Sequence, residues 1–499
     1  MRGKTVHPED NDGLRQLPLT SEAIKRLFAS SADILFSSLL VAGCDALRVT
    51  LVYVDGLSDK KIIDDNVILP LVEGASFQGC AALPDVYRRA LLGALHISSI
   101  TAAADTSEAV AALLEGKALL IFDKMQSALI LETIKYKIRN VESSREESSY
   151  RAAKESFIET LRINTTMLRR RIHSSSLVLE EAVVGRQSNT RVCVAYMRNI
   201  CNEDIIRQVQ GRIKAMNQDA VISTQDIVTS VVQKKYALFP QAITTEKPEI
   251  CAKQLLDGKV AVIADGLPYA MIFPAVFGDL FITLGDYGGH FITTSFFRLL
   301  RYTCLLLSIA LPGFYVSMVT FHPEMIPYDL AIRIAASRTG VPFSVSVETF
   351  AMSIAFITLL QASVLISQNI GSAVSIVGGL VLGQAAITAG YISPGVIVVV
   401  AAASICSLAI PNKDLNTIEW LFQLLCTLLA SVFGLLGVVV TMLILLFMLA
   451  RLTPLGVPYI APFSGTRQIE LNDSAIKFPG NLIKKRPIYL NPKNIRRQP

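Results

Sequence analysis

Two aspartates occupy matched positions in the chain and are the first residues to consider for chemistry. Asp123 follows the apolar run of LLEGKALLIFDKMQSALIL (113–131), and Asp265 follows that of LLDGKVAVIADGLPYAMIFP (255–274). The sequence gives them no complete nucleophile–base set, phosphate-binding loop or metal-ligand spacing. Asp and Gly favour turns through local hydrogen bonds and tolerance of positive φ. We therefore expect each aspartate to open a turn after a buried strand.

The histidines and cysteines do not form a site pattern either. The five histidines are dispersed, and the eight cysteines are scattered without a CxxC pair. A disulfide framework or a zinc site would need a more regular spacing. The sequence therefore predicts reduced, packed thiols, no metal, no cofactor and no enzyme.

The stretches that carry the two aspartates belong to a longer repeat. Each copy has an upstream β-branched run typical of a buried strand, LRVTLVYVDGL in the first and TRVCVAYMRNI in the second. A helical pattern follows each run, and the LLxGK element closes each copy. Its glycine, Gly116 or Gly258, stands where a helix C-cap belongs. This order predicts two α/β subdomains of related topology.

The stretch between the copies is charged and contains Arg169, Arg170 and Arg171. Such a run is typical of a water-exposed helix, although a phosphate-rich surface or an acidic neighbouring subunit would also fit it. The fold class is α/β plus an α-helical membrane domain. The predicted parts are a flexible N-terminus (1–19), α/β subdomain 1 (20–140), a charged helical linker (141–174), α/β subdomain 2 (175–290), a transmembrane helical domain of four to six spans (291–452) and a basic cytoplasmic tail (453–499).

The second half of the chain is mostly apolar and nearly uncharged from about Phe296 to Leu452. Apolar runs of about 18 or more residues are candidates for membrane spans. The third of the five segments is rich in Gly, and the fifth is longer than one span requires. The segments are 296–321, 347–366, 371–390, 393–410 and 420–449.

The charge distribution predicts that both ends of the chain are cytoplasmic. The N-terminus lacks the apolar region of a signal peptide. From Arg451 onward the tail holds nine Lys or Arg against Glu470 and Asp473, and positive residues favour the cytoplasmic side. Two cytoplasmic ends require an even number of crossings. We favour four, with a re-entrant or interfacial third segment, over six, with a tight hairpin in the fifth.

A few residues of the apolar segments and of the tail are candidates for function. Polar groups at membrane depth could line a pore or gate, or form hydrogen bonds between helices. Small residues permit close helix approach, and basic residues beside a membrane contact anionic lipids. The candidates for a pore or gate are Gln384, Glu348, Gln361, Gln368 and Asn369, those for helix packing are Gly378, Gly379 and Gly383, and those for lipid contact are Lys484, Lys485, Arg486, Arg496 and Arg497.

Most of residues 17–465 resembles one known family in many short sequence stretches, which occur in the same order. They include FIETLRINTTMLRRRI, FPQAITTEKPE, TFHPEMIP, AVSIVGGLVLGQAAITAGYISP and GVPYIAPF. In these stretches the chain is similar to the A subunit of bacterial spore germinant receptors of the GerA type. It departs from the family in SIAFITLLQASVL, where relatives carry a glutamate and an LREAG-like stretch, and in IPNKDLNTIEW.

The resemblance implies an integral protein of the spore inner membrane that works with a transporter-like B subunit and a lipoprotein C subunit. It also implies a homo-oligomer that forms a nutrient-gated cation channel and triggers germination. The departures leave an accessory paralogue of the same family open. A non-conducting scaffold and a secondary transporter remain as alternatives, although no repeat within the membrane half supports a transporter.

Overall fold

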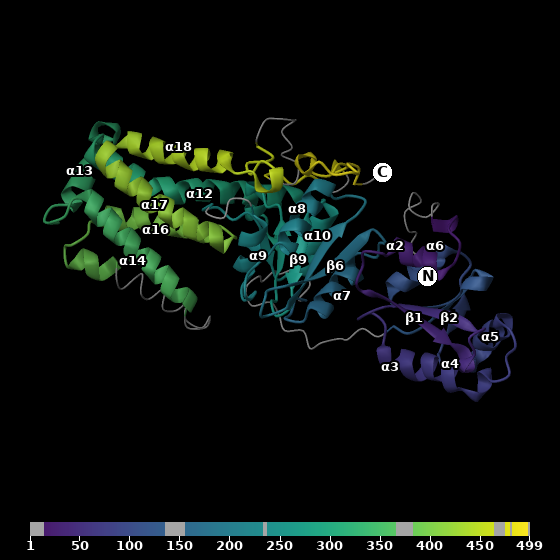
Figure 1. The fold of residues 1–499 in the computed structure, drawn as a ribbon. Helices are drawn as coiled ribbons and strands as arrows, with labels where there is room; N and C mark the ends of the chain where they lie inside the picture. Colours follow the sequence, from purple (N-terminus) through teal and green to yellow (C-terminus); the bar gives the residue numbers. More distant parts are fainter. Residues whose placement is uncertain are drawn as a thin grey trace. The chain divides into compact units, whose positions relative to one another are not determined.

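The computed structural model describes residues 14–134, 155–232, 237–365, 383–463, 475–479 and 482–497. Figure 1 shows that strands gather in one part of the chain and long helices in another. The chain divides into two compact units. The α/β unit comprises Met1–Val231, Thr244–Phe273 and Lys485–Arg497, and the helical unit comprises Val232–Ile243, Pro274–Lys484 and Gln498–Pro499.

The first sheet of the α/β unit has five strands in the order β1-β2-β4-β5-β3. β4 consists of five buried residues, because helices cover both faces of the sheet. Helices α3–α5 pack on one face, and α2 and α6 pack on the other. The elements are α2 (Ser21–Leu27), β1 (Ile34–Leu40), β2 (Arg48–Val54), α3 (Lys60–Ile63), α4 (Leu69–Glu73), α5 (Leu83–Arg89), β3 (Ile100–Ala102), α6 (Thr106–Glu115), β4 (Ala118–Phe122) and β5 (Ser127–Leu131).

The second sheet also has five strands, in the order β6-β7-β9-β10-β8. Counted within each sheet, this is the strand order of the first sheet. Helices α7 and α10 pack together and on β7 and β9, whereas α8 packs on β6 and β9. The elements are α7 (Leu161–Arg171), β6 (Leu177–Val184), β7 (Thr190–Met197), α8 (Glu203–Lys214), α9 (Thr224–Val231), β8 (Ile243–Thr245), α10 (Pro248–Leu256), β9 (Val260–Ala264) and β10 (Ala270–Phe273).

The matched aspartates hold equivalent contacts in the two sheets. Asp123 follows β4, and its carboxylate accepts hydrogen bonds from the amide (2.6 Å) and hydroxyl (2.9 Å) of Ser21, the first residue of α2. Asp265 follows β9 and accepts a hydrogen bond from the amide of Leu161, the first residue of α7, at 2.9 Å. A carboxylate at a helix N-terminus satisfies a free N–H and faces the positive end of the dipole. Both aspartates therefore have a structural role, in addition to their place at a turn.

The glycines of the LLxGK elements have the backbone conformation that their position predicts. Gly116 is the C-cap of α6 with φ 101°, and Gly258 follows α10 with φ 102°. Residues with a Cβ rarely adopt this left-handed conformation. At Gly116 a Cβ would also lie 2.9 Å from the Cβ of Leu57. The C-cap prediction is confirmed at Gly116 in the first copy, whereas in the second copy Asp257 is the C-cap and Gly258 lies one residue beyond it.

The prediction of a water-exposed helix around Arg169 is wrong. Helix α7 lies within the predicted linker and buries one face in the α/β unit. The guanidinium of Arg169 is fully buried and binds both carboxylate oxygens of Asp33, at 2.9 and 3.0 Å. It also donates to the carbonyls of Ser174 and Leu177. A buried charge requires such pairing, and the partner, 136 residues away, links the two halves of the α/β unit.

The helical unit contains three helices that are long and apolar enough to cross a membrane, counted over the described residues. They are α12, residues 345–362 of α14, and α17, and two shorter apolar helices accompany them. The fifth predicted segment is broken at Gly434 (φ 61°) into α17 and α18. The helices are α11 (Leu284–Gly288), α12 (Phe291–Thr320), α13 (Tyr328–Ser337), α14 (Val345–Leu365), α16 (Pro394–Leu408), α17 (Lys413–Phe433) and α18 (Leu435–Arg451).

The directions of these helices follow from the contacts at their ends. At one end, which we call the turn end, Glu348 of α14 contacts Ser393 before α16, and Gly434 lies against Phe321 after α12. At the opposite end, the base, Tyr302 of α12 stacks on Phe281, with ring centroids 4.1 Å apart, and also meets Phe463. Helices α12 and α17 therefore run toward the turn end, whereas α14, α16 and α18 run away from it.

The C-terminal segment 485–497 packs on the α/β unit. The amide of Lys493 donates to the carbonyl of Ile200 at 2.9 Å, and its ammonium pairs with Glu203 at 2.9 Å. Arg486 donates to the carbonyl of Leu256, and Arg497 pairs with Asp257 at 3.1 Å. This part of the predicted tail is thus folded protein.

Candidate functional site

Glu348 forms a buried polar centre at the turn end of the helical unit. Its carboxylate accepts a hydrogen bond from the amide of Ser393 at 2.8 Å and one from the guanidinium of Arg338 at 3.3 Å. Ser393 is the N-cap of α16. The carboxylate therefore faces the positive end of a helix dipole as well as a cation. This arrangement ties α14, α16 and the chain after α13 together.

Hydroxyl groups lie on the same buried part of α14. Thr349 and Ser353 are one helical turn apart, are almost fully buried, and their hydroxyls have no hydrogen-bond partner among the described residues. On α12, the hydroxyl of Tyr315 lies next to Gly395, two residues after Ser393. Polar atoms in an apolar bundle are normally paired. The region around Glu348 therefore gathers several buried polar groups, some of them without a hydrogen-bond partner among the described residues.

A second buried carboxylate, Glu419 of α17, was not among the sequence-based candidates. Its Oε2 accepts a hydrogen bond from the hydroxyl of Ser407 at 2.6 Å, and Ser407 accepts one from the indole of Trp420 at 3.0 Å. Glu419 is 1% exposed. The signal was an acidic residue in an otherwise apolar helical run. It was hidden because the predicted segment began only at Trp420.

A charged network lies at the base of the helical unit. Asp286 of α11 binds both terminal nitrogens of Arg301 at 2.7 and 3.1 Å, and Arg298 approaches it at 3.4 Å. Burial by itself would raise the pKa of the Asp286 carboxyl, but hydrogen bonds from Arg301 and the Thr283 amide hold it below its usual value. The ammonium of Lys477 donates to three carbonyls at the end of α11, Asp286, Tyr287 and Gly289. A cation at a helix C-terminus is stabilising, so the network anchors the start of α12.

The remaining predicted membrane residues are distributed differently from Glu348. Gln361 of α14 and Gln384, which lies in a helical stretch at 383–388, are exposed on the helical unit. Gly383 is buried, and a Cβ there would lie 3.6 Å from Ile397 of α16, an ordinary contact. Among these candidates, Glu348 is buried, whereas Gln361 and Gln384 are exposed. Gln368, Asn369, Gly378 and Gly379 lie outside the described residues.

The basic residues of the tail fall into two groups. Arg486 and Arg497 are partly buried and bind groups of the α/β unit. Lys484, Lys485 and Arg496 are exposed.

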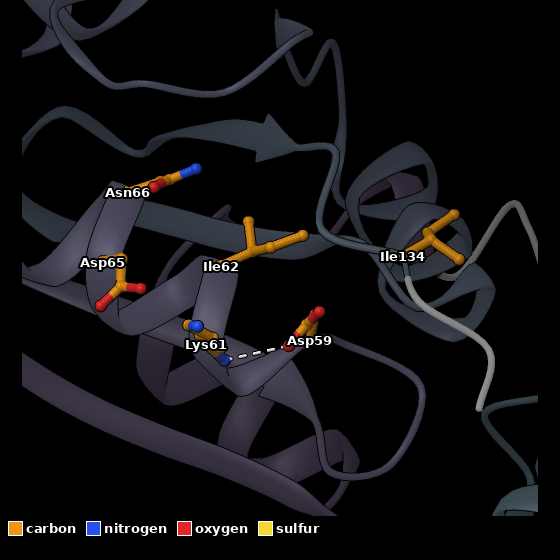
Figure 2. Close-up of a pocket in the computed structure, with 6 residues that line it drawn as sticks. All are labelled: Asp59, Lys61, Ile62, Asp65, Asn66 and Ile134. Carbon is orange, nitrogen blue, oxygen red and sulfur yellow. Dashed lines mark hydrogen bonds between the residues drawn. The ribbon is translucent and has the colours of Figure 1, made fainter.

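An open depression of about 250 Å³ lies in the α/β unit and is shown in Figure 2. Asp59 caps α3, because its Oδ1 accepts a hydrogen bond from the amide of Lys61 at 3.0 Å. Lys61 and Asp65 are the other ionisable residues of the lining. Among the described residues, no group of three or more His, Cys, Asp or Glu could hold a metal. The lining residues are Asp59, Lys61, Ile62, Asp65, Asn66 and Ile134.

Comparison with known proteins gives consistent relatives. A family model described as Bacillus/Clostridium GerA spore germination protein matches residues 22–489. Spore germination protein KA of Bacillus subtilis (strain 168) is 31% identical over 463 residues, which cover 93% of this chain and 84% of that protein. Spore germination protein B1 of the same organism is 30% identical over 477 residues, 96% of this chain and 98% of that protein.

Among solved structures, the chain is similar to the crystal structure of the N-terminal domain of the A subunit of the Bacillus megaterium spore germinant receptor GerK3. The identity is 24% and the TM-score is 0.39, over 51% of this chain and 93% of that chain.

The family match extends through the α/β unit and the helical unit alike, and relatives of about 30% identity cover most of the chain. The family resemblance of the short sequence stretches is thereby confirmed. This chain belongs to the Bacillus/Clostridium GerA spore germination protein family.

Proposed function

We propose that this chain is an integral membrane subunit of a spore germinant receptor and that its copies assemble into a nutrient-gated cation channel. The family assignment supports a role in germination. The observation that carries the channel proposal is the buried Glu348 centre, inside helices whose outer faces are apolar. Ionisable groups inside membrane helices are costly and mark ion pathways or gates.

The helix directions support membrane crossings with both termini on one side. Helices α14 and α16 both start at the turn end and run to the base. We propose six crossings, the count that follows when the fifth predicted segment is a tight hairpin. The helical hairpin at Gly434 supports this count. The base then faces the cytoplasm, together with the basic tail.

Oligomerisation is proposed because one helical unit leaves polar groups on its outside. Gln361 and Gln384 are exposed, and an amide group facing lipid tails is unfavourable. A ring of copies would bring these two amides together along a shared water-filled path. We further propose a transporter-like B subunit and a lipoprotein C subunit as partners, in keeping with the family resemblance.

The channel proposal predicts that Gln384→Leu changes potassium efflux from liposomes that contain the full-length protein. Removing the amide removes a polar group from the proposed path, so efflux should fall several-fold. Ala385→Leu, on the next and likewise exposed residue, controls for the added side-chain volume and should retain most of the efflux. If wild-type protein forms no defined oligomer and shows no efflux even with a co-expressed B subunit, the chain is a non-conducting scaffold or accessory protein.

We also propose that the two halves of the α/β unit are copies of one ancestral subdomain. Their equal strand order and the equivalent contacts of Asp123 and Asp265 support this. We propose an assembly role for this duplicated unit, in which the described residues offer no group of His, Cys, Asp or Glu that could hold a metal.

The exposed tail residues Lys484, Lys485 and Arg496 are proposed to contact anionic lipid, and the partly buried Arg486 and Arg497 to contribute charge nearby. Each basic residue near an anionic surface contributes about 1 kcal/mol. The triple change of the exposed residues to Gln should weaken association of the purified protein with anionic nanodiscs in a salt-dependent manner. Equal association of variant and wild type at low salt would reject the contact.

A further inference from the structure

Helix α13 leaves all of its residues at least partly exposed. It spans ten residues, Tyr328–Ser337, between the end of α12 and the start of α14, and none of them is buried. Seven of the ten are apolar, and the large side chains of Tyr328, Leu330 and Ile332 are 78%, 50% and 49% exposed. An isolated helix of this length is marginal in water, so a further surface must stabilise it.

The polar residues of α13 form one narrow stripe. Asp329, Arg333 and Ser337 are spaced by four, so at 3.6 residues per turn they span about 80° of the helix circumference. The remaining arc, from Leu330 through Ala331 to Ile332, is apolar. A wide apolar arc with a narrow charged stripe is typical of a helix that lies in a membrane interface.

The contacts of α13 fix which side of the helix faces the bundle. α13 packs on α16, and Ala331 and Ile334, in the apolar arc, are only half-exposed. The apolar arc therefore points toward the bundle, and the polar stripe points away from it. Because Tyr328 and Leu330 flank this contact and stay exposed, they extend beyond the area that α16 covers.

The surroundings of α13 continue the apolar surface. The chain enters from α12 and leaves into α14, both of which are long and apolar enough to cross a membrane. Three large side chains in the connecting segments are also exposed, namely Phe321, Met325 and Phe343. Lipid requires no shape complementarity, and it would cover these scattered side chains together with the arc of α13.

We propose that α13 is an interfacial anchor that lies in the outer face of the bilayer, with the part of its apolar arc that α16 leaves uncovered in the lipid and the polar stripe toward water. This inference rests on the proposed membrane placement and adds a lipid-binding element at the turn end. The apolar arc would enter the headgroup and acyl boundary by about 5–10 Å. Tyr328 suits this depth, because its ring is apolar and its hydroxyl is polar.

The test uses the full-length protein with a single tryptophan as a probe, reconstituted in vesicles of ordinary or brominated phosphatidylcholine. The chain has one tryptophan, so Trp420→Phe provides the background. Into it are placed Ile332→Trp on the apolar arc and Arg333→Trp on the polar stripe. Bromine near the headgroups should reduce the emission of Ile332→Trp strongly, whereas Arg333→Trp should keep its emission and be quenched by aqueous iodide.

A third variant separates this inference from the membrane proposal. Ile354→Trp lies at an exposed position of α14 and should be quenched by bromine deep in the acyl chains. If Ile354→Trp is quenched but Ile332→Trp behaves like Arg333→Trp, the anchor proposal is wrong and the membrane proposal stands. If Ile354→Trp is not quenched, the membrane placement fails as well. Emission of Ile332→Trp shielded from both bromine and iodide would overturn the anchor in favour of contact with another copy of the chain.

Discussion

Replacing Arg169 by methionine should lower the free energy of unfolding of the α/β unit by about 3–5 kcal/mol. The guanidinium holds Asp33 through two hydrogen bonds in a site where the side chains are 0% and 3% exposed. Methionine fills a similar volume but leaves the Asp33 carboxylate buried without a counter-charge. The carbonyls of Ser174 and Leu177 also lose their donor. Together these losses produce the largest expected effect of a single substitution in this unit.

The measurement is denaturant unfolding of the full-length protein in detergent, with hydrogen exchange of β1 and α7 to localise the effect. Arg170→Met is the matched control on the next residue. Its pair with Glu155 is much more exposed, and pairs of that kind contribute about 0–1 kcal/mol. Changing Asp33 to leucine together with Arg169→Met should recover part of the loss, because no unpaired charge remains. Equal effects of the two single arginine variants would contradict the role of the buried pair.

Replacing Glu348 by leucine should destabilise the helical unit by about 1–3 kcal/mol and abolish efflux. The amide of Ser393 is then buried without an acceptor, and Arg338 loses its carboxylate. The cost stays below that of a fully orphaned charge, because the Arg338 side chain is 26% exposed and water can hydrate it. Glu348→Gln keeps an oxygen for the Ser393 amide, so it should lose less stability than the leucine variant.

Thermal unfolding in detergent checks the predicted ranking of stability, and potassium efflux from liposomes checks the predicted loss of conduction. Gln361→Leu on the same helix is the control for stability, since that side chain is exposed. Wild-type stability of Glu348→Leu would show that the carboxylate does not hold α14 and α16 together. Wild-type efflux from a folded Glu348→Leu variant would remove Glu348 from the ion pathway.

Local patterns predicted much of the fold. The β-branched runs around Val52 and Val194 are strands β2 and β7, because such residues suit a sheet with both faces covered. Gly116 marked the end of a helix, since its conformation is costly for other residues. The apolar composition of the second half likewise indicated helices that could cross a membrane.

Long-range contacts could not be predicted in this way. The arginine neighbours of Arg169 are typical of a surface and predict a solvated side chain. Its actual partner, Asp33, is distant in sequence and comes near only in the folded chain. Glu419 depends similarly on Ser407, which lies on another helix. The sequence does not decide whether the fifth segment is one helix or two, because a glycine such as Gly434 within an apolar run is compatible with both a continuous helix and a turn. In each case a distant partner or the path of the chain decides the outcome.

The folded C-terminal segment has a consequence for biosynthesis. Residues 485–497 complete the surface of the α/β unit around Ile200 and Leu256, yet they leave the ribosome after every apolar helix has been made. Because translation proceeds from the N-terminus, strands β1 to β10 of the α/β unit are made before the apolar helices, and segment 485–497 is made after them. Ribosome-bound intermediates would therefore carry an α/β unit in which Glu203 has not yet met Lys493 and Asp257 has not yet met Arg497. Synthesis of residues 485–497 closes this surface and couples its maturation to the prior translation of helices α12 to α18.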